Sequence, residues 1–221
     1  MRRHLRLAVG VVAIAGLVSA CHLPTAASGP GTTVPPAAAG GSGLAADDSA
    51  APMPAANTCT MRQQDGQPLP DPRCTPGAIN PAVTQATINS TICVSGWTKT
   101  VRPSTSVTNR MKKLSDTSYG LSTTEKGEYD HLVSLELGGA PDDPRNLWVE
   151  PGKIPNPKDA VENKLSEAVC SGLIPLTTAQ QAIATDWVTA IDTAGLGIVG
   201  GKLCLKADPT RCASGRRGDS D

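Results

Sequence analysis

The sequence predicts an α+β domain that is mostly helical, contains one small two-stranded ribbon and is held together by disulfides. Helices are indicated by Asn-Pro pairs, which are typical of helix starts, and by apolar residues spaced four apart. Strand signals are few and short. The 221-residue chain has no Phe, three Trp and two Tyr. Large aromatic side chains therefore contribute little to the core, and we expect disulfides to compensate.

Four segments are predicted to be helical. Two of them begin at an Asn-Pro pair, in which the Asn caps the helix and the Pro takes its first position. In the last segment, apolar residues recur at every fourth position from Ala179 to Ile191. The predicted helices cover residues 80–92, 107–116, 157–170 and 177–192.

Two strands are predicted, at residues 129–133 and 147–150. Between them, Gly138-Gly139 and Pro144-Arg145 indicate turns. The second strand is followed by the helix that starts at residue 157. The sequence therefore predicts a ribbon of two strands with a helix directly behind it.

Residues 1–20 have the features of a secretion signal peptide, because Arg2, Arg3 and Arg6 precede a short apolar run. The run is shorter than the ~20 residues of a membrane-spanning helix, so a helical anchor is the weaker interpretation. The residues up to Cys21 resemble a bacterial lipobox. That resemblance implies a membrane-anchored lipoprotein with lipid on Cys21, located in the cell envelope outside the cytoplasm. The alternative is a secreted protein without lipid.

The rest of the chain divides by composition. Residues 21–56 are rich in Ala, Pro, Gly, Ser and Thr, which cannot bury a core, so they are predicted to be a flexible linker. Residues 57–212 are predicted to form the globular domain. Residues 213–221 are polar and are expected to be a disordered tail.

The chain contains seven cysteines. If Cys21 carries lipid, an even number remains, as expected for disulfides in an oxidising compartment. Fifteen pairings of six cysteines are possible. Short loops favour two of the bonds and leave the third by elimination, while the absence of any C-x-x-C pair disfavours a zinc site. The preferred set is Cys59 with Cys74, Cys204 with Cys212, and Cys93 with Cys170.

Of the three histidines, only His131 lies in the predicted domain. A histidine-rich transition-metal site is therefore excluded. A Ser-His-Asp triad is disfavoured because the chain has no G-x-S-x-G motif. Any histidine chemistry in the domain depends on His131.

The segment around His131 resembles the HNH, or ββα-metal, nuclease family. The resemblance rests on Tyr129-Asp130-His131, on the turn at Gly138-Gly139, on Asn146-Leu147-Trp148, and on a helix that contains Glu162-Asn163. It is tightest over residues 128–170. A looser similarity, over the run from Cys74 to Trp187, is to exported bacterial proteins that carry this unit. The resemblance implies a small two-stranded ββα-metal unit packed with several helices.

Carried over position by position, the resemblance implies a catalytic role for His131 as the general base that takes a proton from the attacking water. Asp130 corresponds to the adjacent acidic metal ligand. Asn146 corresponds to the middle Asn, which braces the loop and holds the strand of the base. Arg145 could reach a phosphate oxygen, although a plain surface arginine is an equally good interpretation.

The last motif position, a metal ligand on the helix, falls on Asn163. Asp159 and Glu162 lie within one turn of it and are alternative ligands. Asp and Asn supply hard oxygen ligands suited to Mg²⁺ or Mn²⁺. The resemblance therefore implies one divalent metal, which would stabilise charge on the phosphate and on the departing oxygen. An exposed helix residue is the other interpretation of Asn163.

The function expected from these residues is that of a lipid-anchored extracytoplasmic HNH endonuclease, a hydrolase of nucleic-acid phosphodiester bonds, with DNA favoured over RNA. The alternatives are a non-catalytic envelope lipoprotein that uses the scaffold for binding, and a hydrolase of another phosphodiester. Lys+Arg and Asp+Glu both number 20, so contacts to nucleic acid must be local. No protein partner is inferred. The candidate basic run contains Lys99, Arg102, Arg110, Lys112 and Lys113.

Overall fold

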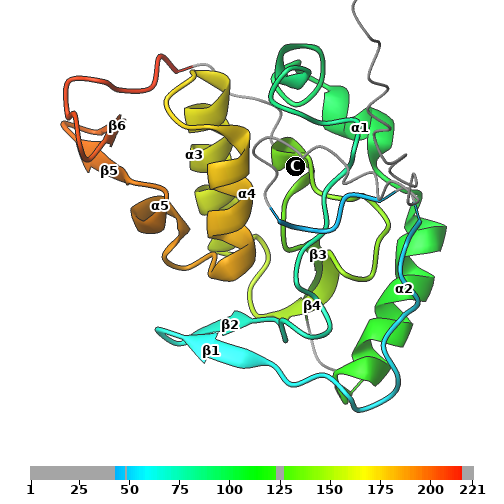
Figure 1. Cartoon of the computed structure of the whole chain (residues 1–221). Helices are drawn as coiled ribbons and strands as arrows, with labels where there is room; N and C mark the ends of the chain where they lie inside the picture. The colour runs from blue at the N-terminus through cyan, green and yellow to red at the C-terminus, as the bar shows by residue number, and fades with distance from the viewer. Residues whose placement is uncertain (1–42, 48, 123–126, 216–221) are drawn as a thin grey trace, which may run out of the picture. The chain divides into compact units, whose positions relative to one another are not determined.

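A computed structural model of the chain describes residues 43–47, 49–122 and 127–215, which all belong to one compact unit (Figure 1). It confirms a mixture of helices with small antiparallel two-stranded sheets. In chain order the elements are β1 (Arg62–Gln64), β2 (Gln67–Leu69), the 3-10 turn η1 (Ile88–Ser90), α1 (Trp97–Val101), α2 (Thr105–Ser118), β3 (Gly127–His131), the 3-10 turn η2 (Leu135–Leu137), β4 (Leu147–Pro151), α3 (Lys158–Cys170), α4 (Leu176–Thr185), α5 (Ala190–Thr193), β5 (Leu196–Val199) and β6 (Lys202–Leu205).

Two of the four predicted helices are confirmed, as α2 and α3. The predicted helix at 177–192 is divided into α4 and α5, because Asp186 is extended (φ −161°, ψ 102°) and its Oδ1 accepts from Val188 N. The prediction of a helix over 80–92 is wrong. There, Asn80 Oδ1 accepts from Ala82 N, and the Thr87 hydroxyl donates to Ala82 O. Such local side-chain bonds compete with helix formation and leave only η1.

The predicted ribbon is confirmed as β3 and β4, which pair antiparallel with Asp130 opposite Trp148 and His131 opposite Leu147. Two further hairpins, β1–β2 and β5–β6, were not predicted. Their connecting residues have positive φ, as in Asp65-Gly66 and Gly200-Gly201. Asp-Gly and Gly-Gly are strong hairpin signals, so the sequence did contain the information.

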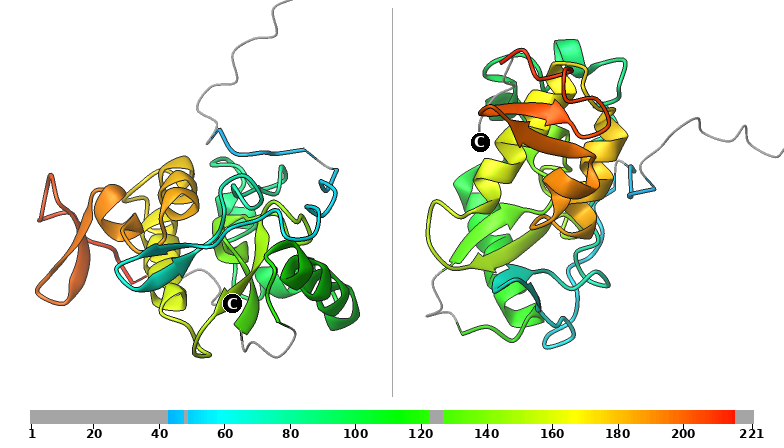
Figure 2. Two further views of the ribbon diagram at one scale, coloured as in Figure 1. Left: turned by 90° about the horizontal axis from the view of Figure 1, so that it is seen from below. Right: turned by 90° about the vertical axis from the view of Figure 1, so that its left-hand side faces the viewer.

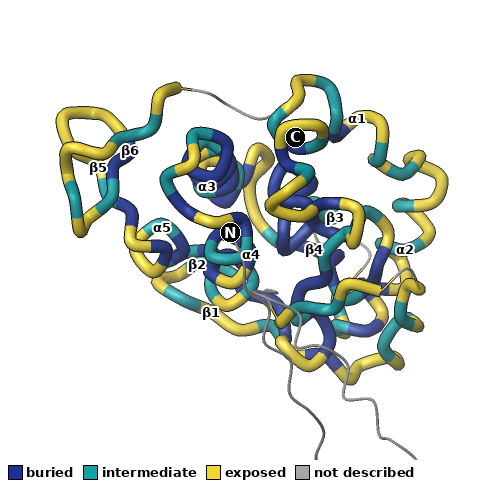
Figure 3. The backbone as a smooth tube through the Cα atoms, turned by 45° about the horizontal axis from the view of Figure 1, so that its top comes forward, coloured by how far each residue is buried: buried dark blue, intermediate teal, exposed yellow. Residues whose placement is uncertain are grey.

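The main core lies where α3, α4 and α5 meet the loop after β3 and the β5–β6 hairpin. Leu165, Val169 and Ile183 are fully buried there, and the tube in Figure 3 shows these inner helix faces as buried. The ribbon β3–β4 lies between α3 and α2, and the β5–β6 hairpin lies at the opposite end of the unit from α2 (Figure 2). The ribbon therefore has a helix on each side.

All three predicted disulfides are confirmed: Cys59–Cys74, Cys93–Cys170 and Cys204–Cys212. The second joins the end of α3 to the segment after η1 across 77 residues. Three disulfides indicate an extracytoplasmic environment. Among the described residues, no helix is long and apolar enough to cross a membrane. The predicted signal peptide and Cys21 lie outside the described residues.

The predicted linker is shorter than expected at its C-terminal end, because described residues from 43 onward contact the domain. Ala45 forms a β-bridge with Ala78. Ser118 Oγ donates to Pro54 O, and the segment then leads into Cys59 beside α2. Composition did not reveal this, because these contacts use backbone groups that every residue has.

Candidate functional site

The face of the ribbon toward α3 contains acidic side chains. Side chains alternate between the two faces of a strand, so Glu128 and Asp130 on β3 share a face. The residues opposite them are Glu150 and Trp148 on β4. Three carboxyl groups of the ribbon therefore point toward the start of α3.

Lys158, the first residue of α3, has a fully buried side chain. Its Nζ donates to Asp130 Oδ2 at 2.6 Å and to Glu162 Oε1 one helical turn further on. Burial disfavours the charged ammonium, but the charges of Asp130, Glu162 and Glu150 outweigh it and raise the pKa of Lys158. The lysine is therefore a buried cation surrounded by carboxyl groups.

Asp130 is the ribbon carboxylate in direct contact with that cation. Burial by itself raises its pKa, but the charge and hydrogen bond of Lys158, together with His131, hold the pKa below its usual value. The side chain of Asp130 remains 17% exposed. It is therefore ionised and also accessible from solvent.

Glu150 completes this group, which we call the Lys158 cluster: Asp130, Glu150, Glu162 and Lys158. Glu150 is 2% exposed, and its Oε2 has no hydrogen-bond partner. Burial, the largest effect, and the charge of Asp130 raise the pKa of Glu150 to about 8, although Lys158 opposes this. The cluster thus has three carboxyl groups for one ammonium, and Glu150 holds a proton at neutral pH.

His131 lies at the end of β3 and is only 4% exposed. Its Nε2 is 3.0 Å from Pro141 O in the loop between the two strands. A carbonyl oxygen only accepts, so Nε2 carries the hydrogen. In the neutral ring the basic nitrogen is therefore Nδ1.

Asn146 braces the same loop from a fully buried position. Its Oδ1 accepts from Val133 N at 2.9 Å, and its Nδ2 donates to Val133 O and Ala140 O. Gly139 permits this arrangement, because a Cβ there would lie 1.8 Å from Val133 O. This is the bracing geometry that the HNH resemblance implies for Asn146, while a part in catalysis stays a prediction.

Arg145 is engaged by acidic side chains. Its guanidinium donates to both carboxylate oxygens of Asp143, to Asp47 and to Ser49 O, and these carboxylates raise its pKa. A pocket of about 170 Å³ beside it is lined by Asp47, Asp142 and Asp143. Both features disfavour the phosphate contact that the sequence suggested for Arg145.

Of the three candidate metal ligands on the helix, the structure brings only Glu162 into the Lys158 cluster. Glu162 is four residues after Lys158 and therefore lies on the same face of α3. Asn163 is turned away, and its Nδ2 donates to Asp159 O on its own helix. Asp159 is half-buried and acts on the cluster through its charge, which helps to raise the pKa of Glu150.

The cluster does not fit the divalent metal that the family resemblance implies. Asp130 and Glu162 have the hard oxygens that Mg²⁺ or Mn²⁺ prefers, but both contact Lys158 Nζ, which takes the position between them. Within the described ranges, no group of three or more His, Cys, Asp or Glu residues is arranged to hold a metal ion. No step of the chemistry below therefore passes through a metal.

Sequence reasoning missed Lys158 and Glu150, and it placed Asn156 at the helix start without foreseeing its contact with Glu128. Asn156 Oδ1 accepts from Lys158 N at 2.8 Å, and its Nδ2 donates to Glu128. One signal was present: a lysine at the first position of a helix opposes the helix dipole. Such a placement indicates that a carboxylate elsewhere compensates.

Comparisons with protein-family models, with curated proteins and with solved structures found no match to this chain.

Proposed function

We propose that this protein is an exported, HNH-like hydrolase of phosphodiester bonds in nucleic acid, with His131 as the general base. The observation that supports it best is the contact between His131 Nε2 and Pro141 O at 3.0 Å. This contact leaves Nδ1 as the basic nitrogen of the neutral ring. A base whose tautomer and orientation are fixed before substrate binds is what activation of a water requires.

The surroundings of His131 support the proposal in two ways. Asn146 and Gly139 hold the loop that carries Pro141, so the ring is supported by a rigid segment. Asp130 lies next to His131, and its carboxylate accepts from the backbone N–H of His131. The negative charge of Asp130 favours the imidazolium that forms when His131 takes a proton.

Nucleic acid would approach the domain from the side of α2, where residues of the candidate basic run are exposed. Alternation on β3 places His131 on the opposite face from Asp130 and on the same face as Tyr129. Burial raises the pKa of Tyr129, and the charges of Asp116 and Tyr119 at the end of α2 raise it further, so this face adjoins α2. The candidate basic run begins before α2, and Lys99, Arg102, Arg110 and Lys113 are exposed. They would track a phosphate backbone.

Nicking of supercoiled plasmid by the purified, oxidised protein tests the proposal, with single-stranded RNA as a second substrate. Each reaction is run with Mg²⁺, with Mn²⁺ and with chelator. We expect cleavage that His131→Ala reduces at least about 100-fold, in line with the loss of a general base. Lys164→Ala, an exposed position on α3, is the matched control. Equal nicking by the His131 variant would reject the assignment.

One observation favours the second candidate, a non-catalytic binding protein built on the same scaffold. Lys158 Nζ joins Asp130 to Glu162 with no exposed surface, as in a purely structural ion pair. This candidate predicts salt-dependent gel shifts of DNA without cleavage under any of the three conditions. Loss of those shifts in Arg110→Ala together with Lys113→Ala would locate the binding surface.

Anchoring through lipid on Cys21 is a separate part of the proposal. We expect a mature protein whose N-terminal Cys21 carries acyl chains and that partitions into detergent. Mass spectrometry of the N-terminal peptide measures this directly, and Cys21→Ala should abolish it. A cleaved N-terminus without acyl chains would favour the secreted alternative.

A further inference from the structure

We infer that Asp47 is a positioning residue for His131, because it fixes the loop whose Pro141 carbonyl sets the tautomer of the histidine ring. Asp47 acts through Arg145, which belongs to that loop. The described residues 43–47 and 49–50, which we call the N-terminal segment, are then part of the site rather than of the linker. The inference rests on the proposed function of His131 as the general base.

The loop between β3 and β4 is long for a hairpin connection. It spans residues 132–146, whereas most such connections have about two to five residues, and ordering a longer loop costs more backbone entropy. Asn146 holds one part of the loop by donating to Ala140 O, but the carbonyl of Pro141 lies beyond that contact. The position of this carbonyl therefore also depends on the residues that follow it, up to Arg145.

Arg145 links those residues to the N-terminal segment. Within the loop, its guanidinium donates to both carboxylate oxygens of Asp143, which is buried. On the other side, Nη1 and Nη2 donate to the two oxygens of Asp47, each at 3.0 Å, and Nη2 also donates to Ser49 O at 3.1 Å. Two parallel hydrogen bonds fix the geometry of an arginine–carboxylate pair. The pair therefore ties the loop to a residue 98 positions away in the chain.

A second attachment of the N-terminal segment uses the backbone. Ala45 O accepts from Ile79 N at 2.8 Å, and Ala78 O accepts from Ala140 N at 2.9 Å. The three stretches of chain therefore lie side by side. A pocket of about 170 Å³ is lined both by the N-terminal segment and by Pro141. The segment thus lies beside the residue whose carbonyl contacts the histidine.

Loss of the Asp47 carboxylate would loosen the loop without unfolding the domain. The Asp47 side chain is 54% exposed, and exposed ion pairs contribute little to global stability. Arg145 would keep its contacts with Asp143. The change would therefore be local: the Pro141 carbonyl would hold Nε2 of His131 for a smaller fraction of the time. The ring would then also adopt the tautomer with its hydrogen on Nδ1, which cannot accept a proton there.

Nitrogen-15 NMR of the imidazole ring of His131 tests the inference, with the signal assigned by its loss in His131→Gln. Asp47→Ala is compared with the wild type and with Asp142→Ala, which removes an exposed carboxylate from the same pocket. We expect the Nε2 proton to exchange with water about two- to fivefold faster in Asp47→Ala, the scale of an exposed ion pair. Asp142→Ala should keep the wild-type rate. Exchange at the wild-type rate in Asp47→Ala, or equal acceleration in both variants, would overturn the inference.

Cleavage kinetics at a series of plasmid concentrations give a second measurement. Asp47→Ala should lower kcat about two- to fivefold and leave KM unchanged, because a positioning residue supports the base without binding the substrate. A change in KM alone would place Asp47 in substrate binding and would overturn the inference. The two proposals fail separately: absence of cleavage by the wild type rejects the nuclease, while the NMR comparison still decides the role of Asp47.

Discussion

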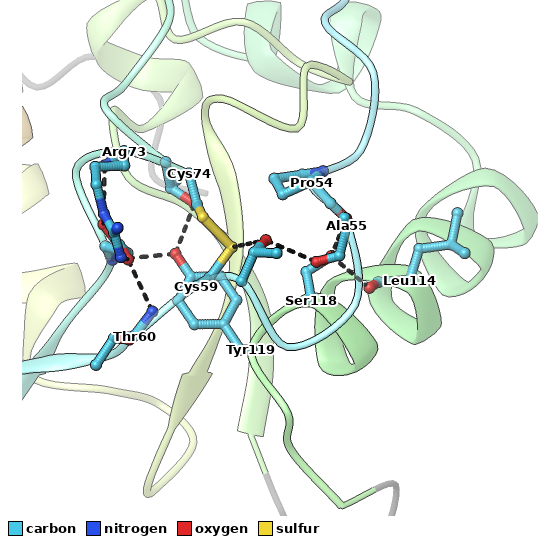
Figure 4. The surroundings of a disulfide bond; sticks show 12 residues. Pro54, Ala55, Cys59, Thr60, Arg73, Cys74, Leu114, Ser118 and Tyr119 are labelled. Atoms are coloured by element: carbon cyan, nitrogen blue, oxygen red, sulfur yellow. Dashed lines mark hydrogen bonds and ion pairs between the residues drawn. A yellow bond between two sulfur atoms is a disulfide. The ribbon is translucent and has the colours of Figure 1, made fainter.

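Two buried carboxylate groups in this molecule are neutralised in different ways. Asp71, beside the Cys59–Cys74 disulfide, accepts four hydrogen bonds: three from Arg73 and one from Thr60 N at 2.8 Å. Figure 4 shows Arg73, Thr60 and Tyr119 around this disulfide. Both oxygens of Asp71 have partners, and its cation Arg73 is 73% exposed.

The Lys158 cluster is the opposite case. Its cation is fully buried, its carboxyl groups outnumber that cation, and Glu150 Oε2 has no partner. The Asp71 arrangement is complete and can be explained by stability alone. A buried cluster of titratable groups with unbalanced charge is a candidate functional position, and the two groups should respond differently to mutation.

The largest effect is expected from Lys158→Met, which keeps the length of the side chain and removes the charge. The carboxylates that remain buried without a cation should lower the free energy of unfolding by about 3 to 5 kcal/mol. Lys164→Met, at an exposed position on the same helix, should change it by no more than about 0.5 kcal/mol. Urea denaturation measures both. Similar values for the two variants would contradict the description of Lys158 as a buried cation.

Asp71→Asn should lower the free energy of unfolding by about 2 kcal/mol at neutral pH, because charge-assisted hydrogen bonds are lost. The hydrogen bond of Arg73, against the opposing effect of burial, holds the pKa of Asp71 below its ordinary value of 3.8. The stability that it contributes is present above about pH 4 and is lost as the pH falls through the lower native pKa. Urea denaturation curves at a series of pH values measure this, and the variant should not show the loss of stability in acid. If the free energy of unfolding of wild type and variant falls in parallel with pH, Asp71 does not contribute the stability described.

Glu150→Gln should have a smaller effect with the opposite pH dependence. The native pKa of Glu150 is raised from 4.5 to about 8, so its contribution to stability is complete below about pH 4.5 and is lost as the pH rises through 8. Glutamine resembles the protonated carboxyl group. We therefore expect the variant to match the wild type near pH 4.5 and to gain stability over it as the pH rises to about 8, by at least about 1 kcal/mol. A gain that is equal at pH 5 and pH 9 would show that Glu150 does not titrate in this range.

The smallest effect is expected from Arg73→Ala. This variant also removes the cation of a buried carboxylate, but the guanidinium is largely in solvent and its charge is screened. Thr60 N and the backbone N–H of Arg73 still donate to Asp71. If Arg73→Ala lowered the free energy of unfolding as much as Lys158→Met, burial of the cation would not explain the difference between the two groups.

Local rules predicted those parts of the fold that depend on neighbouring residues. The Asn-Pro pair before residue 158 located α3, and loop lengths led to the correct disulfide pairing. The rules failed where a single side chain redirects the backbone, as at Asp186. Local rules could not predict the Lys158 cluster, because Lys158 and Asp130 are 28 residues apart and meet only through the packing of α3 on the ribbon.

The contact of the segment before residue 57 with the domain has a practical consequence for the choice of protein fragment. The two terminal guanidinium nitrogens of Arg145, Nη1 and Nη2, donate to Asp47 at 3.0 Å, and Ala45 pairs with Ala78. A fragment that starts at residue 57 lacks both interactions. Arg145 would then keep only its contacts with Asp143, so assays of the proposed function should use the chain with residues 43–56 present.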